Sequence, residues 1–299
     1  MDGSRAGRRR KLCRLVANRR CVPRVKALPV DRRLFHFSPM PPEKIALAVA
    51  TVLFLGGFAH AFLSLRQGAY RHSWTAFGLI AAGFICQCCF LYIRGKALGR
   101  CPITNSFELL TFTGWTTVLF YFLVGSAYRL SLLGAFTAPL AFLMQGTALL
   151  KPDPAAVPAK GAPGMWTELH ATLSLLAYGA FALATVAAVM FLVQDRLLKN
   201  HRAMHIVRTL PPIHHLAKAM RRLIITGVVI LSAGIVAAWQ MESRPAAAKL
   251  VVVWIVWAAY AALLAYESWR GMSSRRAAWA TAACFALAVA SLWFVSPAK

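Results

Sequence analysis

The histidines are the side chains in this sequence best suited to bind a metal ion. His170 stands in the stretch MWTELHATLSLLAYGAF, shortly after Trp166 and Glu168, where a long apolar segment begins. A neutral imidazole at that place can ligate a metal or a heme iron, and aromatic neighbours can cover a porphyrin face. The alternative is that His170 is a polar anchor at the edge of the apolar segment, and His60 has the same two interpretations.

The cysteines suggest packing rather than redox or metal chemistry. Cys86 and Cys89 have CxxC spacing, but they lie inside an apolar stretch, away from the strand–helix context of thiol–disulfide exchange. No second CxxC is present to complete a zinc ribbon, and no CxxCH is present to attach a c-type heme. We therefore predict that these cysteines pack between helices.

Groups that carry out catalysis are absent from the sequence. It contains no Walker motif, HExxH, GxSxG or pair of catalytic carboxylates, so we expect a protein that is not an enzyme. Glu108, Glu168 and Glu267 all stand at the ends of apolar segments, where capping or contact with the membrane surface explains them. The lack of acids within the segments argues against an ion-coupled transporter.

Eight long apolar segments determine the fold class. They cover 45–65, 74–93, 107–128, 131–150, 170–193, 223–241, 248–266 and 277–296. About 20 apolar residues in a helix cross the hydrocarbon core, where every backbone amide must be paired within its own segment. The sequence therefore predicts an all-α fold, a polytopic transmembrane helical bundle of about eight spans whose first partner is the lipid bilayer.

The positive charge follows this topology. The sequence has 34 Lys and Arg against nine Asp and Glu, a formal net charge of +25. Most of the basic residues outside the N-terminal stretch lie in loops between spans, as membrane topology and anionic headgroups favour, so we expect no nucleic-acid partner. From Met40 onward, 13 basic residues fall on one side and nine on the other. The positive-inside rule then places 194–222 in the cytoplasm, with 151–169 and the C-terminus outside.

Residues 1–39 form a basic N-terminal extension with 12 Lys and Arg against Asp2 and Asp31. The extension has no apolar region long enough for a secretory signal. We interpret it as a disordered arm or as the product of a misassigned start, with translation beginning at Met40; the membrane domain is then 40–299.

Four stretches, taken in order, resemble one family. They are GRCPITNSFELLTFTGW (99–115), WTELHATLSLLAYGAFALATVAAVMFLVQDRLLK (166–199), RTLPPIHHLAKAMRRLIITGVVILSAGIVAAW (208–239) and AKLVVVWIVWAAYAALLAYESWRGMSSRRAAW (248–279). Together they resemble the CcsA-like cytochrome c assembly family, and the chain looks closest to its shorter HemX and YpjD branch.

The resemblance implies that heme b is handled at the outer face of a bacterial cytoplasmic (inner) membrane. It implies that His170 ligates the iron, with Trp166, Trp239 and Trp257 around the porphyrin. Five further residues match motif positions of the family: Pro102, Asn105, Glu108, Trp115 and Tyr178. The chain departs from the full-length members because 240–248 replaces their tryptophan-rich core, and their second external histidine has no counterpart before Lys299.

Two functions remain open from the sequence. The first is a factor that binds or passes heme during cytochrome c biogenesis, in partnership with other maturation proteins. The second is a membrane adaptor that regulates heme-biosynthesis or assembly enzymes through the 194–222 loop and binds no heme itself. Independently of either, Ser174, Ala177, Phe181, Ala184 and Ala188 follow His170 along one helical face, which we expect to be turned into the bundle.

Overall fold

The regular structure of the chain is helical throughout the described residues. A computed structural model describes residues 41–66, 74–128, 133–150, 164–199, 212–241 and 247–295. Within these ranges every regular element is an α-helix, and the helices are α2 (Pro42–Arg66), α3 (Trp74–Leu98), α4 (Ser106–Tyr128), α5 (Leu133–Leu149), α6 (Met165–Lys199), α8 (Ile213–Trp239), α9 (Ala247–Arg270) and α10 (Ser274–Val295). The predicted all-α fold is confirmed.

Six of these helices are long and apolar enough to cross a membrane, namely α2, α3, α4, α6, α8 and α9. The apolar helix α5 is shorter, with 17 residues, and α10 is not among the six. Several helices of this kind in one chain imply a multi-pass membrane protein that resides in a lipid bilayer. The N-terminal extension, the 129–132 junction and the 242–246 junction lie outside the described residues.

Several helices extend beyond the apolar spans predicted from the sequence. The predicted 194–222 loop is wrong in its bounds, because α6 continues to Lys199 and α8 already begins at Ile213. Arg94, which directly follows the predicted span 74–93, lies within α3 and is 2% exposed. Hydropathy locates only the part of a helix inside the hydrocarbon, whereas backbone hydrogen bonds continue into polar turns beyond it.

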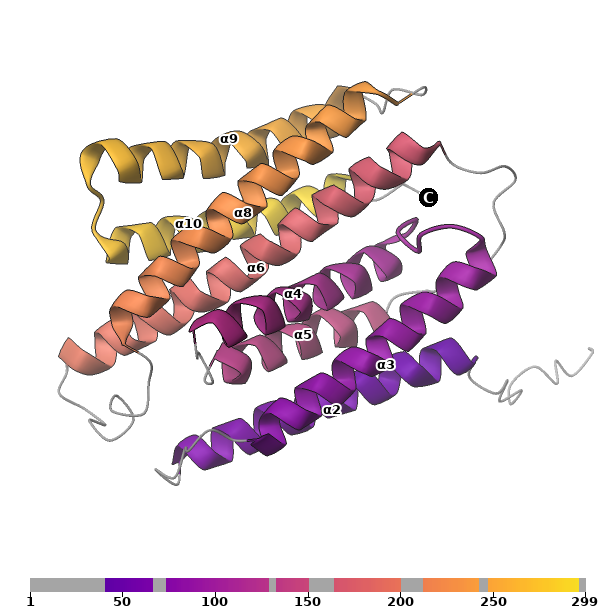
Figure 1. Cartoon of the computed structure of the whole chain (residues 1–299), viewed down its shortest axis with the longest axis horizontal. Coiled ribbons are helices and arrows are strands. Elements are labelled where there is room, and N and C mark those ends of the chain that lie inside the picture. The colour runs from indigo at the N-terminus through magenta and orange to yellow at the C-terminus, as the bar shows by residue number, and fades with distance from the viewer. Residues whose placement is uncertain are drawn as a thin grey trace, which may run out of the picture. The chain divides into compact units, whose positions relative to one another are not determined.

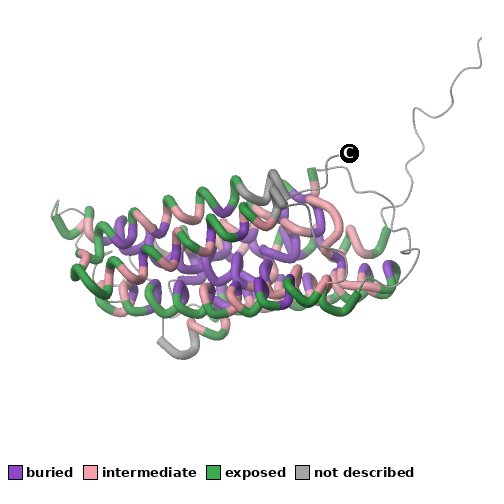
Figure 2. Tube along the Cα trace, turned by 90° about the horizontal axis from the view of Figure 1, so that it is seen from above, coloured by how far each residue is buried: buried purple, intermediate pink, exposed green. Residues whose placement is uncertain are grey.

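Helix α6 lies at the centre of the arrangement (Figure 1). The helices that precede it, α2 to α5, pack against one another, and α4 and α5 also contact α6. The helices that follow it, α8 to α10, form a second group, in which α8 and α10 contact α6 directly. Seen from above, buried segments fill the interior and exposed ones face outward (Figure 2).

The small face predicted for α6 is confirmed. Ala177, Phe181, Ala184 and Ala188 are all 0% exposed, and Ser174 is 9% exposed. Without a hydrophobic driving force between helices in lipid, small side chains hold helices together by allowing close approach. Helix α8 also has a small residue where it meets this face. A Cβ at Gly227 of α8 would overlap the Phe181 ring.

Buried polar side chains in the spans bond mainly within the bundle. The hydroxyl groups of Thr111, Thr117 and Thr137 donate to carbonyl oxygens one turn earlier in their own helices, at 2.7–2.9 Å. Thr51 of α2 also lies 3.2 Å from the side-chain oxygen of Gln145 of α5. Such bonds satisfy groups that would be costly to leave unpaired in hydrocarbon.

Candidate functional site

His170 contacts the backbone of α8. Its Nδ1 atom lies 2.8 Å from the carbonyl oxygen of Gly234, and its side chain is half-buried. A carbonyl only accepts hydrogen bonds, so Nδ1 carries the proton, and Nε2 of the neutral imidazole keeps its lone pair. This is the tautomer that a metal-ligating histidine needs, oriented by a backbone carbonyl.

Gly234 allows α8 to approach α6 at this point. A Cβ there would lie 3.3 Å from Oγ of Ser174 and 3.4 Å from Cβ of Leu173. A side chain at position 234 would therefore contact Leu173 and Ser174, which follow His170 by about one turn of α6.

The loop before α4 is attached to the other side of α6. The backbone N–H of Cys101 donates to Oε1 of Glu168 at 3.3 Å, and the Thr172 hydroxyl donates to the Cys101 sulfur at 3.9 Å. Burial raises the pKa of the Cys101 thiol; the charges of Glu168 and Glu108 add to this, while the hydrogen bond from Thr172 lowers it. Cys101 is thus held as a neutral thiol near neutral pH.

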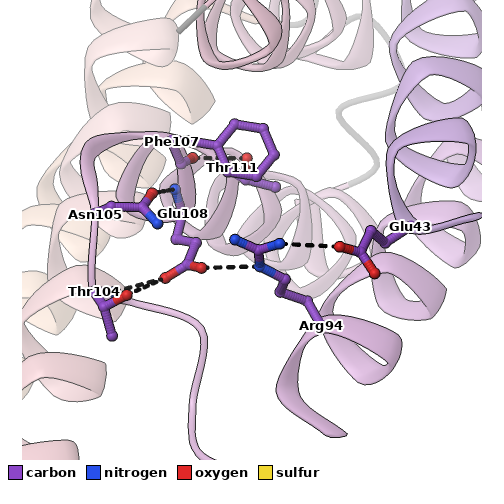
Figure 3. Close-up of polar contacts among 7 residues, drawn as sticks. All are labelled: Glu43, Arg94, Thr104, Asn105, Phe107, Glu108 and Thr111. Atoms are coloured by element: carbon purple, nitrogen blue, oxygen red, sulfur yellow. Dashed lines mark hydrogen bonds and ion pairs between the residues drawn. The ribbon is translucent and has the colours of Figure 1, made fainter. Parts of the chain in front are cut away.

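A buried ion-pair cluster joins three helices at the same end of the bundle (Figure 3). Arg94 of α3 donates from Nη1 to Glu43 of α2 at 2.9 Å and from Nε to Glu108 of α4 at 3.0 Å. Arg94 is 2% exposed and Glu108 0%. Buried charges are tolerated when they are paired and hydrogen-bonded in this way.

The side chains of Asn105 and Glu108 bond the backbone at the start of α4 (Figure 3). The side-chain oxygen of Asn105 accepts the N–H of Glu108 at 2.9 Å, and Oε2 of Glu108 accepts both the N–H and the O–H of Thr104 at 2.8 Å. This arrangement satisfies backbone donors that a helix start leaves unpaired. Glu108 therefore serves both the cap and the ion-pair cluster.

The tryptophans near His170 lie on three helices. Trp166 precedes His170 by one turn on α6 and is 39% exposed, and Trp239 at the end of α8 is 71% exposed. Trp257 of α9 donates from Nε1 to the Ser232 hydroxyl at 2.9 Å, close to Gly234 in α8. Among the described side chains no ring contact joins these three tryptophans, and Trp257 pairs with Trp254 instead.

The comparisons with known proteins fit this arrangement. A family described as cytochrome C assembly protein matches residues 103–296, from just before α4 to just beyond α10. The chain belongs to the cytochrome c assembly protein family. Membership supports a role in cytochrome c biogenesis.

Individual relatives share 27–28% of the aligned residues with this chain. HemX of Brevibacillus brevis is 28% identical over 196 residues, which are 64% of this chain and 69% of that protein. HemX of Bacillus subtilis is 27% identical over 144 residues, or 47% of this chain and 52% of that protein. CcsA of Trieres chinensis is 28% identical over 142 residues, which are 44% of each chain. The chain thus matches about half the length or less of the last two relatives.

The five residues that match motif positions of the assembly family lie in different parts of the fold. Asn105 and Glu108 cap α4, and Pro102 is buried near Gly95 of α3. Trp115 lies elsewhere, inside the span, where its Nε1 donates to the Cys88 sulfur at 3.2 Å and its ring stacks on Phe84. Tyr178 is 3% exposed within α6.

Sequence reasoning missed the partners of these residues. It did not identify Glu43, Arg94, Thr104 or Gly234 as contacts of the cap, the ion-pair cluster and His170. The sequence offered one signal for the cluster. Two acids, Glu43 and Glu108, and one basic residue, Arg94, each stand at the end of an apolar segment. No cluster of three or more His, Cys, Asp or Glu side chains suited to a metal ion occurs in the described part of the chain.

Proposed function

We propose that this protein handles heme during cytochrome c biogenesis, with Nε2 of His170 as a ligand to the heme iron. The hydrogen bond from Nδ1 of His170 to the Gly234 carbonyl is the observation that carries the proposal. It fixes the tautomer and the ring orientation of a half-buried imidazole at one end of the bundle. The role is binding and transfer, and the protein is not an enzyme.

The surroundings of His170 suit a flat apolar ligand. Heme b would supply an iron that takes imidazole as an axial ligand and a large apolar ring. Trp166 and Trp239 present exposed indole rings at the same end, and such rings can cover a porphyrin. The start of α6 and the end of α8 are thus the elements that would hold the heme.

A single protein ligand to the iron would suit transfer of heme better than its permanent storage. In the part of the chain that the structure describes, no group of three or more His, Cys, Asp or Glu side chains surrounds His170. His170 would hold the heme from one side only, and a single protein ligand would favour its release to a receiving protein. We place this end outside a bacterial cytoplasmic membrane, as the distribution of basic residues favours.

The decisive experiment is the absorbance spectrum of the protein purified from cells with ample heme. The wild type should show a Soret band that His170→Ala removes, while both proteins elute identically on size exclusion. His214→Ala is the matched control, since His214 is an exposed histidine in the first turn of α8, at the opposite end of that helix from Gly234. A wild type without heme, or a His170→Ala variant that keeps the band, contradicts the proposal.

A further inference from the structure

The end of the bundle opposite His170 is strongly basic. We call it the basic end; it comprises the last turns of α6 and α9 and the first turns of α8 and α10. Eight Lys and Arg residues stand there against the two carboxylates of Asp195 and Glu267: Arg196, Lys199, Lys218, Arg221, Arg222, Arg270, Arg275 and Arg276. At the His170 end, the described side chains include four basic groups (Lys44, Arg94, Lys96, Arg100) and three acidic ones (Glu43, Glu108, Glu168).

Both carboxylates of the basic end are already engaged in ion pairs. Asp195 of α6 lies 3.0 Å from Nζ of Lys199 and 3.6 Å from Nε of Arg275. Glu267 of α9 lies 3.6 Å from Nε of Arg221 of α8. These pairs link α6 to α10 and α8 to α9, and the described side chains at the ends of these helices carry a net excess of six positive charges.

The start of α8 presents its basic groups on one side. His214, Lys218, Arg221 and Arg222 are exposed, whereas Leu216, Ala219, Met220 and Leu223 are buried against the bundle. Helix positions four and seven residues apart share a face, so these basic side chains form a continuous stripe that faces away from the protein.

Large aromatic side chains are exposed at the same end. Trp269 is 86% exposed, Tyr266 53% and Trp279 52%. They flank the turn between α9 and α10, which also bears Arg270, Arg275 and Arg276. Exposed Trp and Tyr beside cations are typical of the headgroup level of a bilayer, where the ring is in the apolar layer and its polar edge meets water.

We propose that the basic end binds the headgroups of anionic phospholipids. Guanidinium groups match a phosphate diester in charge and hydrogen-bonding geometry, and the indole rings contact the adjoining acyl chains. The same cations are those that an acidic protein partner would need. A protein partner would bind at the water-facing surface and would leave the exposed ring of Trp269 in contact with lipid. The exposed tryptophans therefore favour a lipid as the ligand. The proposal is independent of heme binding by His170.

The test compares lipid retention in nanodiscs made with phosphatidylcholine alone or with phosphatidylglycerol added. The variant Lys218→Gln/Arg270→Gln/Arg276→Gln removes three exposed cations that take part in none of the ion pairs above. Native mass spectrometry should show that the wild type prefers phosphatidylglycerol, by a factor on the order of fivefold for each cation that contributes. The variant should lose most of this preference, whereas Arg270→Lys/Arg276→Lys should keep it and Lys96→Gln, at the His170 end, should not change it.

Three results would overturn the proposal. The first is equal retention of the two lipids by the wild type. The second is an unchanged preference in the triple variant that still elutes as a folded protein. The third is loss of a co-purifying acidic protein from the triple variant while its lipid preference equals that of the wild type. Heme content, read from the same samples, should not differ among these proteins, which separates this result from that for His170.

Discussion

The rings of Phe181 and Tyr260 stack face to face, with centroids 3.8 Å apart and planes at 7°. Phe181 belongs to the central helix α6 and Tyr260 to α9, and both are 0% exposed. The Phe181 ring also lies against Gly227 of α8, so this aromatic pair contacts three helices. This contact adds to the direct packing of α9 on α8 and α10.

Adding a methyl group at Gly227 should therefore destabilise the protein. A Cβ at this position overlaps the Phe181 ring, and overpacking of this kind costs about 1–3 kcal/mol. Gly227→Ala should lower the thermal unfolding temperature in detergent. Gly78→Ala is the matched control, because a Cβ at Gly78 meets nothing within 4 Å. An equal unfolding temperature for the two variants would show that the stack tolerates displacement.

Removing Arg94 should leave two acids at a buried site without their cation. We expect Arg94→Met to cost about 3–5 kcal/mol, as for other broken buried ion pairs. In the double variant Arg94→Met/Glu108→Gln the cost should be clearly smaller than the sum of the single changes. Unfolding measurements on the four proteins of this cycle give the coupling energy. Additive costs would mean that the two side chains do not stabilise each other.

Losing the Asn105 cap should weaken the start of α4. Asn105→Ala leaves the Glu108 N–H without its acceptor and should cost about 0.5–2 kcal/mol. Asn105→Asp keeps an acceptor oxygen and should retain most of the stability. Hydrogen exchange at the amides of Phe107 and Glu108 reports on this helix start alone. Unchanged hydrogen exchange in Asn105→Ala would show that Asn105 does not stabilise the start of α4.

The Cys101 thiol should react slowly with alkylating reagents. Its pKa is raised by burial and further by the charge of Glu168, so the reactive thiolate forms only at higher pH than for an ordinary thiol. The rate at which maleimide labels Cys101 should therefore keep rising at pH values where the rate for an exposed cysteine has already levelled off. Glu168→Gln removes one negative charge, lowers the pKa and should shift the rate profile to lower pH. A shift in the opposite direction would contradict the assigned charge effect.

Larger residues on the small face of α6 should impair assembly. Ala177→Leu or Ala184→Leu inserts three carbons at positions with 0% exposure, at a cost of about 1–3 kcal/mol or more. Val189→Leu serves as the control on the same helix, since Val189 is 41% exposed. Yield of monodisperse protein on size exclusion measures the effect. Normal yield of both alanine variants would mean that neighbouring helices can move apart.

The spans and the buried face of α6 were predictable because they depend on composition and helical periodicity alone. The contacts of His170 and Glu108 were not predictable. Gly234 is 64 residues from His170, and Arg94 becomes a partner of Glu108 only when the ends of α3 and α4 meet. Such pairings depend on how helices pack, and hydropathy does not encode packing. Trp115, which shares a motif with Glu108, likewise bonds to Cys88 of α3 rather than near His170.

The central place of α6 has a consequence for biosynthesis. Helices α2 to α5 are made before α6, and the ion-pair cluster of Glu43, Arg94 and Glu108 is complete once α4 has entered the membrane. Helix α6 then has one side to pack on this first group, while the side that contacts α8 and α10 stays open to lipid until those helices are synthesised. A ribosome that stalls after α6 would therefore leave a small-residue surface exposed in the bilayer, where membrane chaperones and proteases can recognise it.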